Sequence, residues 1–246
     1  MGNLKQIQQD EQAVKHYWQT HGLHSLEGES YQERWRREIY TPNWMAIIRA
    51  CIELGELGGS ERVLEVGSGW GRIIVGMKMM LPELQIVGVD LVNELTRHAK
   101  AVVSAETGYL DVRFCVGDAQ ELPFRTAQFD AVISARVLQY VPSPALAVRE
   151  FARVTKPGGK VVVLLPNRLN PIRQYRYPAR LYAPSEIGAW FDKARLQGID
   201  TRSICFIPPW FRASHRSALL SLEVLQKVPV INQYGGLAAA SGRKPR

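Results

Sequence analysis

From residue 62 to residue 166, short apolar runs alternate with longer stretches in which apolar residues recur at helical spacing. The short runs predict five strands, at 62–66, 85–89, 111–116, 129–134 and 160–165. The stretches between them predict helices over 70–81, 93–107 and 144–155. Strands that alternate with helices form a parallel sheet covered on both faces, and right-handed crossovers bring ligand-binding loops to its carboxyl edge. We therefore expect a ligand site at that edge.

The two flanks of this core have a different pattern. Residues 1–60 are predicted to be helical, most strongly over 43–54, and we interpret them as an N-terminal helical cap over a substrate. Residues 61–166 form the predicted ligand-binding core. Residues 167–246 are expected to complete the sheet and to insert basic, aromatic lid segments. In this last part the pattern predicts helices at 185–196 and 217–227 and strands at 199–207 and 237–241.

Three glycines, Gly67, Gly69 and Gly71, follow the first predicted strand within five positions. A tight turn from strand to helix needs one or two glycines, so three indicate that a ligand approaches the backbone closely. Dinucleotide-binding loops usually have the spacing G-x-G-x-x-G, whereas this loop has G-x-G-x-G, with Glu65 inside the preceding strand.

The glycine loop is the first of five segments that together resemble class I S-adenosylmethionine-dependent methyltransferases. The others, in the order of the family, are Val87 to Leu91 (VGVDL), Val116 to Phe124 (VGDAQELPF), Phe129 to Ser134 (FDAVIS) and Leu146 to Gly159 (LAVREFARVTKPGG). The resemblance covers about residues 60 to 166. It implies a Rossmann-like α/β fold with a seven-stranded, mostly parallel sheet and helices on both faces.

The resemblance also implies a cofactor, S-adenosylmethionine, and its product form, S-adenosylhomocysteine. By similarity, Asp90 holds the ribose hydroxyls, Leu91 packs on the adenine, Asp118 and the Ala119 amide contact the adenine edge, and Glu65 lies near the amino-acid moiety. The residues expected to bind the cofactor are Glu65, Gly67, Ser68, Gly69, Gly71, Asp90, Leu91, Asp118, Ala119 and Arg136.

The segment after the fourth strand, Ser134 to Tyr140, bears on the substrate. It lacks the [DN]-P-P-[YF] motif of many methyltransferases that act on nucleic-acid bases or protein glutamine, and it resembles the form common in small-molecule enzymes. We expect methyl transfer to an O, N or C atom of a small aromatic or lipid-like molecule, with or without an acidic group. The candidate catalytic residues are Tyr17, His21, His24 and Tyr140. The candidate pocket residues are Trp18, Trp35, Arg173, Tyr175, Arg176, Tyr177 and Trp210.

The charge is distributed unevenly along the chain. The net charge is +8, but residues 1–165 sum to −1 and residues 166–246 to +9. A series of arginines, Arg168, Arg173, Arg176 and Arg180, is interleaved with tyrosines and could grip a carboxylate or phosphate, contact an anionic surface, or contact RNA. The basic last part of the chain leaves an RNA methyltransferase open as an alternative. An NAD-dependent oxidoreductase and a non-catalytic module that binds S-adenosylmethionine are the other two alternatives. We do not expect a nucleic-acid partner.

The remaining composition sets the class and compartment. The chain is 46% hydrophobic, and its longest apolar runs are far shorter than the roughly 20 residues of a membrane span. The isolated Cys51, Cys115 and Cys205 indicate neither a metal site nor a disulfide framework. We expect a cytoplasmic protein without a metal, and the sequence leaves open whether it is a monomer or a homodimer.

Overall fold

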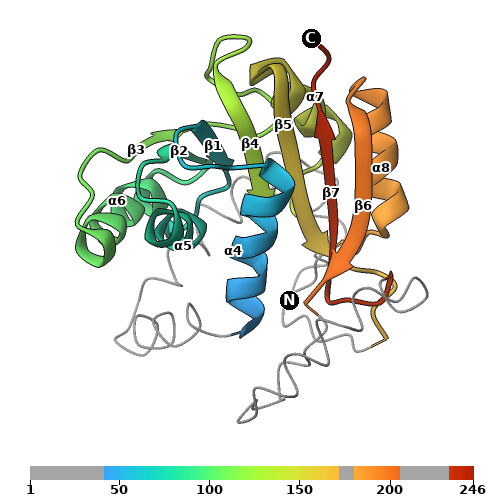
Figure 1. The fold of residues 1–246 in the computed structure, drawn as a ribbon, viewed down its shortest axis with the longest axis horizontal. Coiled ribbons are helices and arrows are strands. Elements are labelled where there is room, and N and C mark those ends of the chain that lie inside the picture. Colours follow the sequence, from blue (N-terminus) through green and yellow to red (C-terminus); the bar gives the residue numbers. More distant parts are fainter. Residues whose placement is uncertain (1–41, 172–179, 206–232) are drawn as a thin grey trace.

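The computed structural model describes residues 42–171, 180–205 and 233–246. They form one seven-stranded sheet in the order β3-β2-β1-β4-β5-β7-β6 (Figure 1). The strands are β1 (Arg62–Val66), β2 (Gln85–Asp90), β3 (Arg113–Val116), β4 (Phe129–Ala135), β5 (Thr155–Pro166), β6 (Gln197–Ile204) and β7 (Leu237–Arg243). Only β7 runs antiparallel to its neighbours, so the predicted mostly parallel sheet is confirmed.

Helices cover both faces of the sheet, as predicted. They are α4 (Pro42–Gly55), α5 (Arg72–Met80), α6 (Asn93–Thr107), α7 (Pro144–Val154) and α8 (Pro184–Lys193). One apolar cluster joins α4, α5 and α6 to alternate strand residues such as Val63, and the other joins α7 and α8 to the opposite set, such as Leu64. This alternation follows from the side-chain period of two in a strand.

Several element boundaries differ from the prediction, and the two differences at β5 and α8 follow from contacts of the chain. Strand β5 begins at Thr155 rather than residue 160, because Thr155 pairs with Phe129 and the Gly158 amide donates to the Lys244 carbonyl. Helix α8 begins at Pro184, one residue before the predicted cap at Ser185, and the Glu186 carboxylate accepts from the Ala183 amide. The predicted helix at 217–227 lies outside the described residues.

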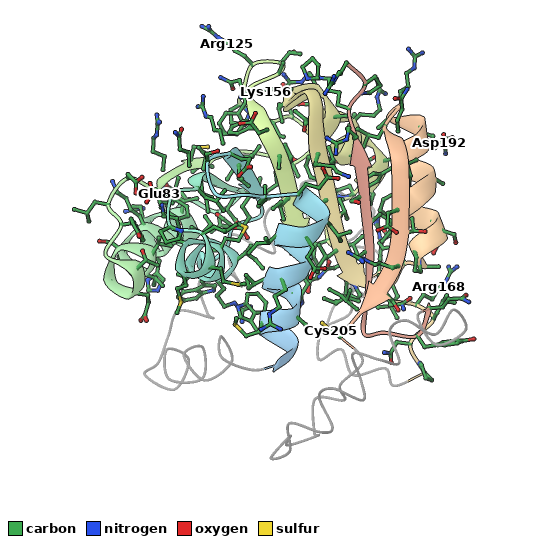
Figure 2. The ribbon with its side chains drawn as sticks, viewed as in Figure 1. Glu83, Arg125, Lys156, Arg168, Asp192 and Cys205 are labelled. Carbon is green, nitrogen blue, oxygen red and sulfur yellow. The ribbon has the colours of Figure 1, made fainter. Side chains whose placement is uncertain are left out.

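The two edges of the sheet carry different groups. Strand order reverses between β1 and β4, so the crevice typical of ligand sites in such sheets lies at their carboxyl ends. In Figure 2, Arg168 and Cys205, which follow β5 and β6, mark this edge, whereas Arg125 and Lys156 lie at the opposite edge. The glycine loop joins β1 to α5 at the carboxyl edge.

A buried lysine of α5, Lys78, connects this helix to the segment that follows it and to Tyr109 after α6. Lys78 is 2% exposed, and its Nζ donates to the carbonyls of Pro82 at 2.5 Å and Leu84 at 3.1 Å. The same nitrogen lies 4.0 Å from the centroid of the Tyr109 ring. Burial of a charged side chain is tolerated here because its donors are satisfied locally.

We expect Lys78→Met to lower the free energy of unfolding by about 2–4 kcal/mol, because methionine fills the space but leaves the Leu84 carbonyl buried without its donor. Urea denaturation would measure the change. Lys100→Met, at an exposed position of α6, is the matched control and should change stability by less than about 0.5 kcal/mol. Equal effects of the two substitutions would show that the buried contacts of Lys78 are not needed.

Candidate cofactor site

The glycine loop turns through left-handed backbone conformations at all three glycines. The φ angles of Gly67, Gly69 and Gly71 are 76°, 49° and 78°, a region that L side chains rarely adopt. A Cβ at Gly67 would lie 2.2 Å from the Val137 side chain, and one at Gly71 would lie 2.8 Å from that of Val103. Two of the three glycines therefore exclude side chains because the protein itself packs there.

Gly69 differs from the other two glycines. A Cβ at this position would meet no atom of the described residues within 4 Å. The next residue, Trp70, packs edge-to-face against His98 of α6, with ring centroids 4.3 Å apart. The loop is thus packed against the protein on both sides of Gly69 but not at Gly69 itself. Of the three glycines that the sequence predicts to lie close to a ligand, Gly69 is the one with open space beside it.

Asp90 connects the glycine loop to the end of β2. Its Oδ2 accepts a hydrogen bond from the Gly69 amide at 2.8 Å, and its Oδ1 accepts from the Val92 amide at 3.0 Å. Burial raises the pKa of this carboxyl, and hydrogen bonds from the backbone amides of Val92, Gly69 and Leu91 oppose that rise. Since each carboxylate oxygen has a second lone pair, Asp90 can still accept from a ligand. Leu91 beside it is partly exposed.

Glu65 is the penultimate residue of β1, two positions before the first glycine of the loop. Its side chain is 2% exposed, and the residue pairs across the sheet with Gly88 of β2 and Ile133 of β4. No hydrogen-bond partner of its Oε2 is present among the described residues. Burial, with a smaller contribution from the negative charge of Asp90, raises the pKa of Glu65 well above its usual value, and the cation of Arg72 opposes this.

Two further buried polar side chains at this edge lack partners. Ser68 is 5% exposed and Gln139 is 1% exposed, and neither the Ser68 Oγ nor the Gln139 Oε1 has a hydrogen bond within the described part of the chain. An unsatisfied buried polar atom costs about 1–3 kcal/mol, so such atoms are expected where a polar ligand binds. Sequence reasoning missed Gln139, although a single polar side chain within the apolar stretch 137–141 was a usable signal.

The loop after β3 lies beside Asp90. The Gly117 amide donates to the Asp90 carbonyl at 2.9 Å, which ties the two loops together. The Asp118 Oδ1 accepts from the Gln120 amide at 2.9 Å, and Ala119 is buried. The two predicted cofactor acids, Asp90 and Asp118, therefore stand at the ends of adjacent strands.

The loop after β4 holds the last described candidates. Arg136 is exposed, with a φ of 62°, and its amide donates to the Leu164 carbonyl at 2.7 Å. Tyr140 is half-buried. The Ser134 hydroxyl donates to the Val66 carbonyl at 3.1 Å, which holds β4 against the start of the glycine loop. Tyr140 is thus the predicted catalytic residue that the structure describes.

The other candidates on the flanks lie outside the described residues. These are Tyr17, Trp18, His21, His24, Trp35, Arg173, Tyr175, Arg176, Tyr177 and Trp210. Two arginines of the basic series are described and have partners within the chain. Arg168 lies 3.1 Å from Glu186, and the Arg180 guanidinium donates to the Pro142 carbonyl at 3.0 Å. Because a guanidinium has five N–H donors, these contacts do not exhaust either side chain, and the role of the arginine series stays a prediction.

One contact at this edge, between α4 and α5, could not be predicted from the sequence. The Arg72 guanidinium, at the start of α5, lies 4.7 Å from the centroid of the Trp44 ring, near the start of α4. This contact brings the amino end of α4 next to the glycine loop.

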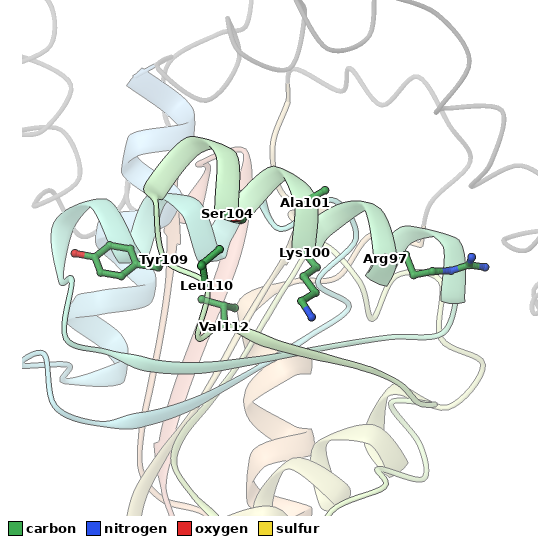
Figure 3. A pocket seen from close by; sticks show the side chains of 7 residues that line it. All are labelled: Arg97, Lys100, Ala101, Ser104, Tyr109, Leu110 and Val112. Atoms are coloured by element: carbon green, nitrogen blue, oxygen red, sulfur yellow. The ribbon is translucent and has the colours of Figure 1, made fainter.

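A shallow cavity of about 300 Å³ lies elsewhere, between α6 and the β3 side of the sheet (Figure 3). Its lining residues are Arg97, Lys100, Ala101, Ser104, Tyr109, Leu110 and Val112. None of them is a predicted site residue.

Comparison with known proteins agrees with this geometry. Residues 64–163 match the family model described as a methyltransferase domain. A ubiquinone biosynthesis O-methyltransferase of Xanthomonas axonopodis pv. citri is 30% identical over 181 residues, which cover 67% of this chain and 74% of the relative. The chain belongs to the S-adenosylmethionine-dependent methyltransferase family.

Other members of the family match over shorter or more distant alignments. A demethylmenaquinone methyltransferase of Deinococcus radiodurans is 36% identical over 103 residues, 42% of each chain. An uncharacterized methyltransferase of Schizosaccharomyces pombe is 36% identical over 107 residues, 42% of this chain but only 38% of that relative. A solved S-adenosylmethionine-dependent methyltransferase of Thermotoga maritima shares the fold, with a TM-score of 0.64 and 19% identity, over 94% of this chain and 99% of that chain.

The cofactor of this methyltransferase is S-adenosylmethionine, and the described residues fit it. The open position at Gly69 leaves room beside the backbone, Asp90 has lone pairs for hydroxyl donors, and Glu65 offers a buried carboxyl to a cation. When bound, the cofactor supplies a methyl group on a positively charged sulfur. Within the described ranges, no helix is long and apolar enough to cross a membrane, and no cluster of three potential metal ligands occurs.

Proposed function

We propose that this methyltransferase transfers the methyl group to a ring hydroxyl oxygen of a small aromatic molecule with an apolar tail, a quinol-like acceptor. The observation that carries the proposal is the similarity to ubiquinone biosynthesis O-methyltransferases, which extends over about three quarters of those relatives. A 2-methyl-6-phytyl-1,4-hydroquinone methyltransferase of Spinacia oleracea, 28% identical over 64% of this chain, is also a relative whose named substrate is a ring with a long apolar chain.

The described core supports an acceptor site at the carboxyl edge. The contact of Arg72 with Trp44 brings the start of α4 to this edge. The chain also leaves the core here at Pro171 and Cys205, because β5 and β6 both end at the carboxyl side. The predicted pocket residues all belong to the segments that join the described core at this edge, so we place the acceptor beside the glycine loop.

The protein itself has to align the acceptor oxygen with the methyl group and to remove the proton of the acceptor hydroxyl. Methyl transfer is an in-line displacement, so the enzyme gains most by holding the acceptor oxygen in line and excluding water. A hydroxyl acceptor must also lose its proton. We assign this step to the half-buried Tyr140 or to the undescribed Tyr17, His21 and His24, as the sequence predicts.

The proposal is tested by offering the purified protein a panel of acceptors with S-adenosylmethionine and identifying the products by mass spectrometry. We expect addition of one methyl group to a catechol or quinol with a short isoprenoid tail. The same ring with its hydroxyls already methylated should be inert, and the ring without the tail should react more slowly because apolar contacts are lost. Methylation of RNA, with no methylation of any aromatic acceptor in the panel, would contradict the proposal and support an RNA methyltransferase.

Two binding measurements separate the alternatives without a known acceptor. Binding of RNA that falls steeply with log[salt] would support an RNA substrate, since each phosphate contact releases counterions. S-adenosylhomocysteine should raise the melting temperature and NAD should not, because only a ligand that binds the native state stabilises it. Stabilisation by NAD alone would favour the oxidoreductase.

A further inference from the structure

Gln139 carries a buried amide oxygen that lacks a hydrogen-bond donor. The residue follows β4 and is 1% exposed, and its Oε1 has no hydrogen bond within the described part of the chain. Buried polar atoms without a partner are rare, because their desolvation costs free energy that no contact offsets. Neither the predicted cofactor contacts nor the removal of the acceptor's proton involves this oxygen. It is therefore available to a donor that the acceptor brings.

The turn that carries Gln139 is packed against the glycine loop. The Tyr140 amide donates to the Val137 carbonyl at 2.9 Å and closes the turn. The Val137 side chain lies against Gly67, where an added Cβ would be 2.2 Å from it. Leu138 is fully buried in the apolar cluster that joins α7 and α8 to the sheet. The neighbours of Gln139 in the sequence therefore fix it beside the glycine loop.

The order of the strands puts this turn on the acceptor side of the cofactor site. The predicted contacts to the adenine, the ribose and the amino-acid moiety follow β3, β2 and β1, which are consecutive in the sheet, and β4 is the next strand. Methyl transfer is an in-line displacement, so the acceptor must approach the methyl group from the side opposite the sulfur. This places the acceptor over β4, where Gln139 lies.

An amide oxygen can bind a hydroxyl group but cannot remove its proton, because it accepts hydrogen bonds without being a base. A hydroxyl held by Gln139 keeps its proton, whereas the oxygen that attacks the methyl group must lose one. We propose that Gln139 binds the acceptor hydroxyl that stays unmethylated and so determines which hydroxyl of the ring is methylated. The other hydroxyl oxygen forms the new C–O bond as the methyl–sulfur bond breaks, and its proton passes to the base.

This inference rests on the proposed function, since it concerns the same acceptor site, and it narrows the acceptor to rings with at least two hydroxyl groups. A ring with a single hydroxyl would leave the Gln139 oxygen buried without a donor. A site built to bind a hydroxyl strongly rejects an analogue that lacks it.

Two acceptors test the proposal: a catechol with a short isoprenoid tail, whose two hydroxyls are inequivalent, and the same ring without the hydroxyl that stays unmethylated. We expect the unmodified protein to prefer the first by about tenfold or more in kcat/KM and to form one monomethylated isomer. Gln139→Met keeps the length of the side chain but has no amide. It should lose both the preference and the isomer selectivity.

Two further variants are the controls. Gln139→Glu keeps an acceptor oxygen and should retain the preference and the single isomer. Gln197→Met, at an exposed position at the start of β6, should behave as the unmodified protein. All variants should bind S-adenosylhomocysteine with the affinity of the unmodified protein, because the inference assigns Gln139 to the acceptor.

The proposal is overturned if Gln139→Met slows both rings by the same factor and still forms one isomer, which would show a packing role alone. Weaker binding of S-adenosylhomocysteine with an unchanged isomer ratio would also overturn it and place Gln139 at the cofactor. If Gln139→Met does not fold, equal kcat/KM of the unmodified protein for the two rings gives the same answer. If the unmodified protein methylates no ring, the proposed function itself fails, and the inference fails with it.

Discussion

Replacing Asp90 with alanine is expected to weaken S-adenosylmethionine binding about ten- to a hundredfold. The ribose hydroxyls would lose two charge-assisted hydrogen bonds of about 1.5–3 kcal/mol each, partly compensated by water. The Gly69 amide would also lose the carboxylate oxygen that holds it at 2.8 Å. Isothermal titration calorimetry with the folded variant measures the loss.

Two matched variants separate the roles of Asp90. Asp90→Asn keeps the shape and one acceptor oxygen, so we expect an affinity between those of the unmodified protein and of Asp90→Ala. Asp192→Ala, at an exposed acid of α8, should bind as tightly as the unmodified protein. An unchanged affinity of folded Asp90→Ala would remove Asp90 from the cofactor site.

A substitution at Gly67 is expected to reduce mainly the stability of the protein, and a substitution at Gly69 mainly its cofactor binding. Gly67→Ala should lower the free energy of unfolding by about 2–5 kcal/mol, because its Cβ overlaps Val137 and its φ is positive. Gly69→Val should destabilise by only about 1–2 kcal/mol from the positive φ. It should abolish cofactor binding, since the branched side chain fills the space beside the loop.

Denaturant unfolding and titration with S-adenosylhomocysteine, done on both variants, distinguish these effects. Gly69→Ala is the smaller companion of Gly69→Val and should fold with reduced rather than abolished binding. Normal binding by Gly69→Val would show that the loop has a packing role alone. A Gly67→Ala protein as stable as the unmodified one would show that Val137 can move aside.

The comparison of these two glycines also shows what the sequence can predict. The G-x-G-x-G spacing locates the loop, its place after β1 and its strained turns, because these properties are local. It does not show that Gly67 packs against Val137, which lies 70 positions later, while Gly69 stays open. That distinction requires the β1–β4 pairing, which is a tertiary property.

Long-range pairing also explains the other differences. The Lys-Pro-Gly-Gly turn predicts the end of a helix. In the structure, however, Thr155 belongs to β5 because it pairs with Phe129, and the turn belongs to β5 because it hydrogen-bonds to Lys244. The short apolar run places Glu65 in a strand but does not reveal that its Oε2 has no hydrogen bond from the described residues. The absence of a partner depends on every neighbour at once, so only the folded arrangement shows it.

The position of β7 has a consequence for biosynthesis. This strand follows the other six along the chain, yet it lies between β5 and β6 and pairs with both. Until residues 237–243 have emerged from the ribosome, β5 exposes the edge of its apolar run Val161–Leu165. A nascent chain at that stage is prone to aggregation and suited to chaperone binding, because an unpaired apolar edge can pair with another chain. Closure of the sheet therefore awaits the synthesis of its last strand.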